Sequence, residues 1–287
     1  MNCFVYAMTN TKPILITGGT GKTGRRVAQR LVDAGHQVRV GSRNGEPGFE
    51  WNNPDTWESV LADAQAVYLA YYPDLAFPGA AETVRAFAER GVAMGVERFV
   101  LLSGRGEPGA EISEAGVRAV AAHWTVLRSS FFSQNFSEHF LLDPVLAGVI
   151  ALPAGNVGEP FIDADDLAEI AVAALTSDKH DQQVYELTGP RLLTLADAAE
   201  ELSRATGRPI TYHPVSAEEY VELAVSHGVP AEEAGPLAQL FSEVLDGRNA
   251  HVTTDVSRAL GRPATDFRSY ATATAATGIW NPKQAAR

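Results

Sequence analysis

Three glycines near the start of the chain, Gly18, Gly21 and Gly24, separate a short apolar run from a helix-like segment. The triplet GKT in this stretch also occurs in the phosphate loops of nucleoside triphosphatases. Such a loop needs a further glycine five residues before the glycine of GKT. Ile16 occupies that position, and a β-branched residue there indicates a strand. The spacing is instead typical of a turn that binds the pyrophosphate of a dinucleotide.

Each glycine has a physical role in such a turn. Gly18 permits the tight exit from the strand, Gly21 lets the backbone approach the pyrophosphate, and Gly24 lets the helix pack against the sheet. The free N–H groups and partial positive charge at the helix N-terminus stabilise phosphates. The sequence therefore predicts a dinucleotide cofactor.

The end of the next predicted strand, residues 37–41, indicates which dinucleotide is preferred. An acidic residue there would bind the ribose 2′-hydroxyl of NAD. This chain has Ser42 and Arg43 at that place, and the first acid that follows is Glu46. Since a guanidinium matches a phosphate in charge and shape, we expect NADP(H) to be preferred over NAD(H). The alternative is that Arg43 is only an exposed charge at a strand end.

An alternation of strands and helices must position these residues. We expect strands at residues 14–17, 37–41, 66–71, 98–103 and 124–128, with a weak one near 49–51. Helices are expected at residues 23–34, 53–63, 80–95 and 113–121. This order predicts an α/β fold: a Rossmann-like, doubly wound parallel sheet formed by residues 13–150.

The pattern changes in the second half of the chain. Short strands are expected at residues 148–152, 184–187 and 210–213, and helices at 164–176, 195–206 and 217–226. Residues 228–247 are expected to add mobile helices near a pocket. No flexible linker separates the halves, so we expect residues 151–287 to form a smaller α+β substrate lobe interwoven with the first domain.

Composition limits the partners. The 287 residues carry a formal net charge of −12, which argues against a nucleic acid or an anionic membrane as partner. The single cysteine, Cys3, excludes an internal disulfide and fits a reducing cytoplasm. No apolar run reaches membrane-spanning length, and the opening residues do not form a signal peptide. We expect a disordered leader over residues 1–12, with Met8 as a possible natural start.

Several kinds of catalytic site are not supported. There is no G-x-S-x-G motif, and no pair of histidines has the H-E-x-x-H spacing. Asp163, Asp165 and Asp166 are more simply explained as capping and charging the start of the helix at 164–176 than as metal ligands. We therefore expect no metal.

Five segments together resemble the NmrA-like branch of the atypical short-chain dehydrogenase/reductase family. They are ITGGTGKTGRRV, VGSR, RFVLLSG, WTVLRSSFFSQNF (Trp124–Phe136) and FIDADDLAEIA (Phe161–Ala171). The segments reach across about two-thirds of the chain, and the last two are the most specific to this branch. The resemblance implies a Rossmann-like NADP-binding fold, and its members include quinone reductases and sensors of NADP.

The resemblance also implies roles for individual residues. Thr20, Lys22 and Thr23 would line the pyrophosphate, and Tyr71 would lie near a ribose. Ser103 and Gly104 would reach the nicotinamide. The nicotinamide and the substrate pocket beside it would be flanked by Phe131, Phe132 and Asn135, with Tyr72 and Phe136 also assigned to the pocket.

One feature departs from the larger family. Most short-chain dehydrogenases use a Tyr-x-x-x-Lys pair, in which the lysine lowers the tyrosine pKa for proton transfer. None of the eight tyrosines here has a lysine four residues later. This absence argues against alcohol oxidation and simple ketone reduction.

The expected activity is hydride transfer from NADPH to a quinone or another planar, apolar, conjugated acceptor. The resulting anion is delocalised and can take a proton from solvent, while Ser103 or Asn135 donates a hydrogen bond to the acceptor oxygen. An NADP(H)-binding redox sensor without turnover, and a non-redox isomerase or lyase, are the alternatives. A cytoplasmic monomer or homodimer is expected.

Overall fold

The computed structural model describes residues 12–282, so the expected leader lies outside the described residues except for Lys12. Six parallel strands form the central sheet in the order β2-β1-β3-β4-β5-β7. Their bounds are β1 Ile14–Thr17, β2 Val38–Gly41, β3 Ala66–Leu69, β4 Arg98–Gly104, β5 His123–Ser129 and β7 Gln183–Leu187. The doubly wound parallel sheet is confirmed.

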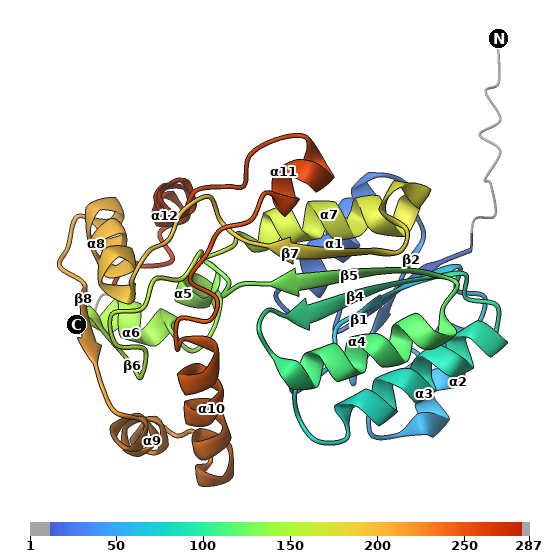
Figure 1. Ribbon diagram of the computed structural model, residues 1–287, viewed down its shortest axis with the longest axis horizontal. Coiled ribbons are helices and arrows are strands. Elements are labelled where there is room, and N and C mark those ends of the chain that lie inside the picture. The colour runs from blue at the N-terminus through green and yellow to red at the C-terminus, as the bar shows by residue number, and fades with distance from the viewer. Residues whose placement is uncertain (1–11, 283–287) are drawn as a thin grey trace, which may run out of the picture.

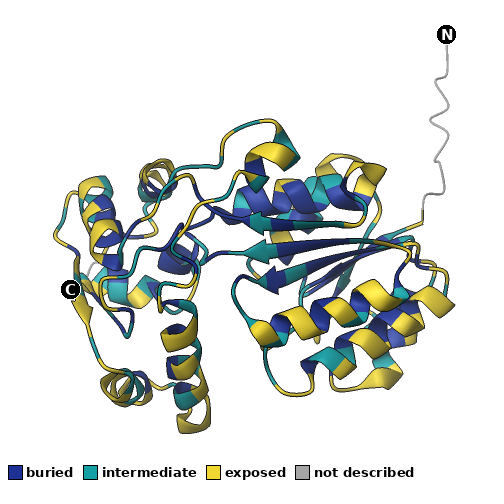
Figure 2. Ribbon diagram, viewed as in Figure 1, coloured by how far each residue is buried: buried dark blue, intermediate teal, exposed yellow. Residues whose placement is uncertain are grey.

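Helices cover both faces of this sheet (Figure 1). One face carries α1 (Gly24–Asp33) and α7 (Ala164–Thr176). The opposite face carries α2 (Trp57–Leu61), α3 (Ala80–Ala93) and α4 (Pro108–Val120). Because both faces are covered, β1 and β3 are buried along their whole length, which explains their continuous apolar sequences (Figure 2).

A second lobe lies beyond the carboxyl ends of the strands (Figure 1). Its two parallel strands, β6 (Val149–Leu152) and β8 (Thr211–Pro214), pair with each other and not with the main sheet. The surrounding helices are α5 Asn135–Glu138, α6 Leu142–Ala147, α8 Leu195–Thr206, α9 Ala217–Ser226, α10 Ala231–Val244 and α12 Phe267–Ala276. They enclose a separate apolar core that includes Phe161, Phe267 and Trp280.

The two lobes alternate along the chain. After β6 the chain returns to the main sheet to form α7, the short 3-10 helix η2 (Asp178–His180) and β7. It later returns again as α11 (Asp255–Leu260), which packs on α7 and β7. The start of α7 is capped by the Asp163 side chain, which accepts the N–H of Asp165, as expected from the sequence.

The weak strand expected near residues 49–51 is wrong. Phe49 and Trp51 lie in a loop that folds onto the face of the sheet, where their rings pack against Phe87 at 5.5 and 5.0 Å. Two buried aromatics around an exposed Glu50 imitate the alternation of a strand, although no neighbouring strand pairs with them. The loop ends in the 3-10 helix η1 (Pro54–Thr56). The strand expected at 66–71 is therefore the third of the sheet, and it ends at Leu69, before Tyr71.

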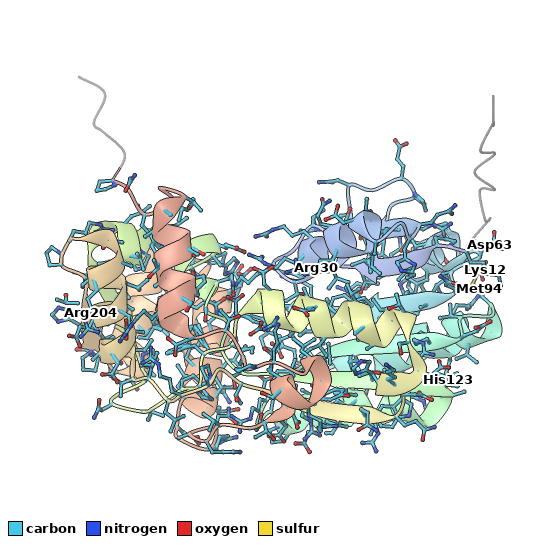
Figure 3. All side chains as sticks on the ribbon, turned by 90° about the horizontal axis from the view of Figure 1, so that it is seen from above. Lys12, Arg30, Asp63, Met94, His123 and Arg204 are labelled. Carbon is cyan, nitrogen blue, oxygen red and sulfur yellow. The ribbon has the colours of Figure 1, made fainter. Side chains whose placement is uncertain are left out.

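The orientation of the strands decides where a site can form. Figure 3 places Lys12, Asp63, Met94 and His123 at the end of the sheet remote from the second lobe, and Arg204 in that lobe. The carboxyl ends of β4 and β5 point toward the second lobe (Figure 1), the position at which open α/β sheets bind ligands. Within residues 12–282, every helix is too short or too polar to cross a bilayer.

Candidate functional site

The glycine turn between β1 and α1 has the geometry that its sequence predicts. Gly18 adopts a φ of +61°, in the left-handed region that glycine enters without strain, and its carbonyl accepts the N–H of Gly21 at 2.8 Å. A β-carbon on Gly24 would collide with the backbone of Gly18 and Gly19. The helix therefore starts in direct contact with the turn, with its free N–H groups beside the strand end.

A cavity of about 370 Å³ opens beside this turn, and we call it the edge cavity. It brings together five of the residues expected to bind the cofactor: Gly18, Thr20, Gly21, Ser42 and Arg43. In residues 12–282 the Arg43 side chain makes no hydrogen bond or ion pair to another side chain, so its charge faces solvent and the cavity. The aromatic loop at Phe49 and Trp51, which the sequence analysis interpreted as a strand, forms another wall.

A second cavity of about 230 Å³ lies at the carboxyl ends of β4 and β5, and we call it the strand-end cavity. It is lined by six of the residues expected around the nicotinamide and the pocket: Tyr71, Ser103, Gly104, Phe131, Phe132 and Asn135. The remaining walls come from the loop after β3 and from the end of α10, including Val244 and Leu245. The cavity thus lies between the main sheet and the second lobe.

Two residues that were expected in the substrate pocket, Tyr72 and Phe136, lie elsewhere in the structure. Tyr72 is 70% exposed and lines the edge cavity, whereas its neighbour Tyr71 faces the strand-end cavity and packs on Trp51. Phe136 is wholly buried among Phe131, Phe161 and Phe267 and does not line the cavity. It belongs to α5 and to the core of the second lobe.

The role expected for Ser103 also needs correction. Its hydroxyl donates to Glu114 at 2.7 Å, and Arg128 holds the same carboxylate with bonds of 2.7 to 3.2 Å. A serine hydroxyl has one proton, and here that proton is committed to a buried partner. Toward the cavity the Ser103 oxygen can accept a hydrogen bond but not donate one.

Asn135 links the glycine turn to the second lobe. Its Oδ1 accepts a hydrogen bond from Lys22 Nζ, and the Lys22 ammonium lies 5.7 Å from the centre of the Phe132 ring. Burial, together with Arg26 and Arg25, lowers the pKa of Lys22 to about 8 although Glu138 opposes the shift. A phosphate near this amine would favour its charged form. Thr23 is buried at the start of α1 and lines neither cavity.

Three acidic residues in the strand-end cavity were missed by the sequence analysis. Asp74 follows β3, Glu107 precedes α4, and Glu159 lies on an isolated bridge to Leu193. Burial raises the pKa of Glu159 to about 7, although the Phe131 N–H bonds it at 3.1 Å and Arg105 attracts it. Burial and the neighbouring Asp74 carboxyl raise the pKa of Glu107 to about 8, and burial also raises that of Asp74. No local motif marks these residues; only the fold brings them together.

Arg105 fixes the wall opposite these acids. The residue is 3% exposed, and its guanidinium donates to the Asn249 carbonyl at 2.8 Å and to Glu186 at 3.2 Å and contacts His251. The bonds join the end of β4 to the segment between α10 and α11. Among the described residues, no cluster of three histidine, cysteine or acidic side chains has the arrangement of a metal site.

Two relatives match nearly the whole chain in sequence. An uncharacterised oxidoreductase, YesF, of Bacillus subtilis is 33% identical over 95% of this chain and 99% of its own length. The agroclavine dehydrogenase of Claviceps fusiformis is 33% identical over 90% of this chain and 95% of its own length. No protein-family model matches the chain.

Solved structures show the same fold at lower identity. The Citrobacter triphenylmethane reductase complexed with NADP(H) has a TM-score of 0.73 at 20% identity, covering 92% of this chain and 99% of its own. The Escherichia coli NADPH-dependent quinone oxidoreductase QOR2 has a TM-score of 0.74 at 20% identity, covering 91% and 99%. The negative transcriptional regulator NmrA in complex with NAD has a TM-score of 0.69 at 16% identity, covering 94% and 99%. The chain belongs to the NmrA-like branch of the atypical short-chain dehydrogenase/reductase family and is an NAD(P)H-dependent reductase.

Proposed function

We propose that this protein reduces a quinone or a similar planar, conjugated small molecule and uses NADPH in preference to NADH. The observation that carries this proposal is the strand-end cavity, lined by Phe131 and Phe132, whose wall contacts Lys22 of the glycine turn. Two half-buried aromatic side chains favour a flat, apolar ligand.

The chain's residues fit a dinucleotide. The glycine turn and the N-terminus of α1 would hold the pyrophosphate, with Lys22 as an additional cation. The edge cavity would hold the adenosine, and Arg43 would bind its 2′-phosphate. When bound, the nicotinamide supplies the hydride.

The protein's own contribution is orientation and exclusion of water. The aromatic wall would align the acceptor in the strand-end cavity, and the Asn135 amide, whose oxygen already bonds Lys22, keeps its N–H groups available to the acceptor oxygen. Ser103 is left out of this role because its proton bonds Glu114.

Two measurements test the proposal. Rapid mixing of the NADPH-loaded protein with a panel of quinones should show loss of NADPH absorbance in a single turnover. Calorimetric titration should show tighter binding of NADPH than of NADH. Binding of both cofactors without consumption by any conjugated acceptor would contradict the proposed activity.

A further inference from the structure

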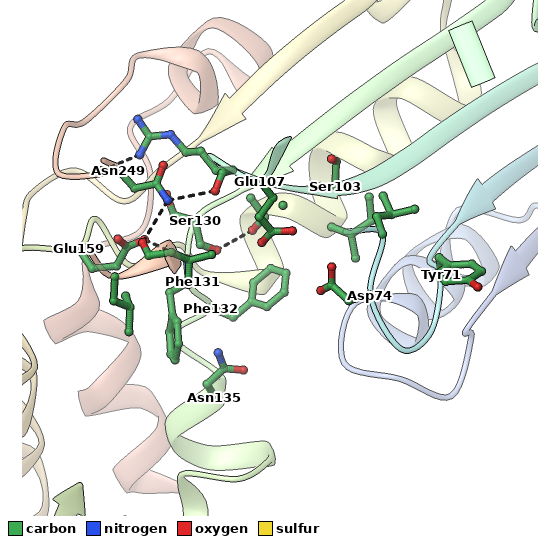
Figure 4. Close-up of a pocket in the computed structure, with 17 residues that line it drawn as sticks. Tyr71, Asp74, Ser103, Glu107, Ser130, Phe131, Phe132, Asn135, Glu159 and Asn249 are labelled. Carbon is green, nitrogen blue, oxygen red and sulfur yellow. Dashed lines mark hydrogen bonds between the residues drawn. The ribbon is translucent and has the colours of Figure 1, made fainter. Parts of the chain in front are cut away.

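Two carboxyl groups meet in the strand-end cavity at the place where the reacting atoms of a substrate would lie. Asp74 lies in the loop after β3, and Glu107 is the residue before α4. Their side chains point toward one another in the cavity (Figure 4). They are within hydrogen-bonding reach of each other. Glu107 also covers the end of β4 so closely that Gly104 has no room for a β-carbon.

The two carboxyl groups can form a hydrogen bond with each other only if one of them carries a proton. Two carboxylates can only accept hydrogen bonds, and Glu107 Oε2 is buried without a donor within residues 12–282. The charges nearby do not neutralise the pair. Glu243 of α10 adds negative potential. The Arg105 guanidinium already bonds Glu186 and the Asn249 carbonyl. Since like charges this close cannot both ionise, one proton stays on the pair at neutral pH.

A second, separate observation indicates that a ligand bonds in this cavity. Glu159 is 4% exposed and lines the same cavity, and its Oε2 is buried with no partner in the described part of the chain. Buried polar oxygens are nearly always hydrogen-bonded in folded proteins. Unpartnered oxygens on both Glu107 and Glu159 therefore fit a site that is completed by a polar substrate group.

We propose that Glu107, with Asp74 as its partner, is the acid that protonates the reduced substrate in place of the missing tyrosine. The inference rests on the proposed function. A neutral acceptor that has gained a hydride at carbon holds a new electron pair on its oxygen or nitrogen. This pair forms a bond to the Glu107 carboxyl proton, the carboxyl O–H bond breaks, and the Glu107 carboxylate regains a proton from solvent.

Substrate charge provides the sharpest test. Hydride addition to a neutral quinone creates an anion that must be protonated, whereas addition to a cationic triarylmethane dye gives a neutral product that needs no proton. In single turnovers at pH 7, Glu107→Gln should slow quinone reduction by about 100-fold, a typical contribution of a general acid, and leave dye reduction unchanged. The matched control Glu82→Gln, an exposed residue of α3, should alter neither reaction.

The pH dependence gives an independent readout of the pair. Asp74→Asn removes the negative neighbour, so the pKa of Glu107 should fall and quinone reduction should decline at a lower pH than in the unmodified protein. Dye reduction by the same variant should show no such displacement. An unchanged pH profile would exclude Asp74 as the partner.

Infrared spectroscopy tests the proton without turnover. At pH 7 the unmodified protein should show the carbonyl absorption of protonated carboxyl groups; Glu107→Gln should remove one component of it, Glu82→Gln should remove none, and the component of Glu159 should remain in both variants. A carbonyl absorption that is the same in Glu107→Gln as in the unmodified protein, or equal slowing of quinone and dye reduction, would overturn the assignment of Glu107. If the unmodified protein reduces neither acceptor, the proposed function fails, and the infrared band still decides whether Glu107 holds a proton.

Discussion

The edge cavity and the strand-end cavity are built in different ways. The edge cavity is lined by residues between Gly18 and Tyr72, so one stretch of the chain supplies it. The strand-end cavity draws on residues from Tyr71 to Asn249, including the second lobe. The first therefore depends mainly on local backbone conformation, and the second on how distant segments pack together.

The two cavities also differ in charge. The edge cavity offers Arg43 and the N–H groups of the glycine turn, which suit phosphates. The strand-end cavity contains Asp74, Glu107 and Glu159, whose pKa values are raised by burial. The proposed cofactor site and the proposed proton donor thus lie in separate parts of the molecule, and variants should affect one without the other.

The largest effect should come from filling the contact between α1 and the glycine turn. In Gly24→Val the side chain would collide with the backbone of Gly18 and Gly19, which cannot move aside as a side chain does. We expect the free energy of unfolding to fall by about 3 kcal/mol and NADPH binding to be lost. Chemical denaturation and calorimetry measure the two effects.

The control for this variant is Gly235→Ala in α10. A β-carbon there meets no atom within 4 Å beyond its chain neighbours, and the gain in helix propensity is opposed by the ring of Pro236, so stability should change by less than about 1 kcal/mol. A Gly24→Val protein that bound NADPH normally would show that α1 does not need to contact the turn.

Removing the charge of Glu159 should stabilise the protein at alkaline pH. Burial raises its pKa from 4.5 to about 7, so the folded state keeps a proton that the unfolded state loses. The stability from this group is fully present below pH 4.5 and is lost as pH rises through about 7. Glu159→Gln should therefore match the unmodified protein at pH 4 and exceed it at pH 8 by roughly 3 kcal/mol.

Denaturation curves at the two pH values measure this difference. Glu82→Gln, an exposed site, should follow the unmodified protein at both. If Glu159→Gln were the less stable protein at pH 8, the carboxylate would have to gain more from Arg105 and the Phe131 N–H than it loses by burial.

An effect of intermediate size should appear at the edge cavity alone. Arg43→Ala removes the guanidinium expected at the 2′-phosphate, and NADPH affinity should fall by about 10- to 100-fold, as for the loss of a charged hydrogen bond. NADH affinity and stability should not change, because Arg43 bonds no other side chain within residues 12–282. Arg204→Ala, in the distant part of the second lobe (Figure 3), is the control. Equal losses for both cofactors would remove the assignment of Arg43.

Much of the fold could be predicted because its signals are local. The strand at 14–17 and the helices at 164–176, 195–206 and 217–226 were predicted with the observed bounds. The strand is a continuous apolar run, and each helix is an apolar period preceded by a capping side chain. The short helices α5, α6 and α11 were missed, since four to six residues carry too little periodicity. The ten-residue α12 was also missed; its alternation of alanine and threonine gives a weak pattern.

The candidate site divides in the same way. The glycines and Arg43 could be found because one turn and one strand end fix their positions. Asp74, Glu107 and Glu159 lie on three separate loops, and only the packing of β4, α4 and the second lobe buries them together. Tyr72 was misplaced because it and its neighbour Tyr71 line different cavities, and Phe136 because the short helix α5 buries it in the second lobe's core. A sequence pattern alone reveals neither.

The smallest expected effect tests whether Ser103, in the strand-end cavity, contributes to stability or to the reaction. Ser103→Ala removes one hydrogen bond to the buried Glu114, while Arg128 still holds that carboxylate at 2.7 Å. We expect a loss of about 1 kcal/mol in the free energy of unfolding and little change in quinone turnover. Thr125→Val is the control, since its buried hydroxyl bonds the His180 carbonyl at 2.7 Å and neither residue lines the cavity. If Ser103→Ala slowed turnover strongly at unchanged stability, the serine hydroxyl would have to donate to the substrate instead of to Glu114. Ser103 would then take part directly in the reaction.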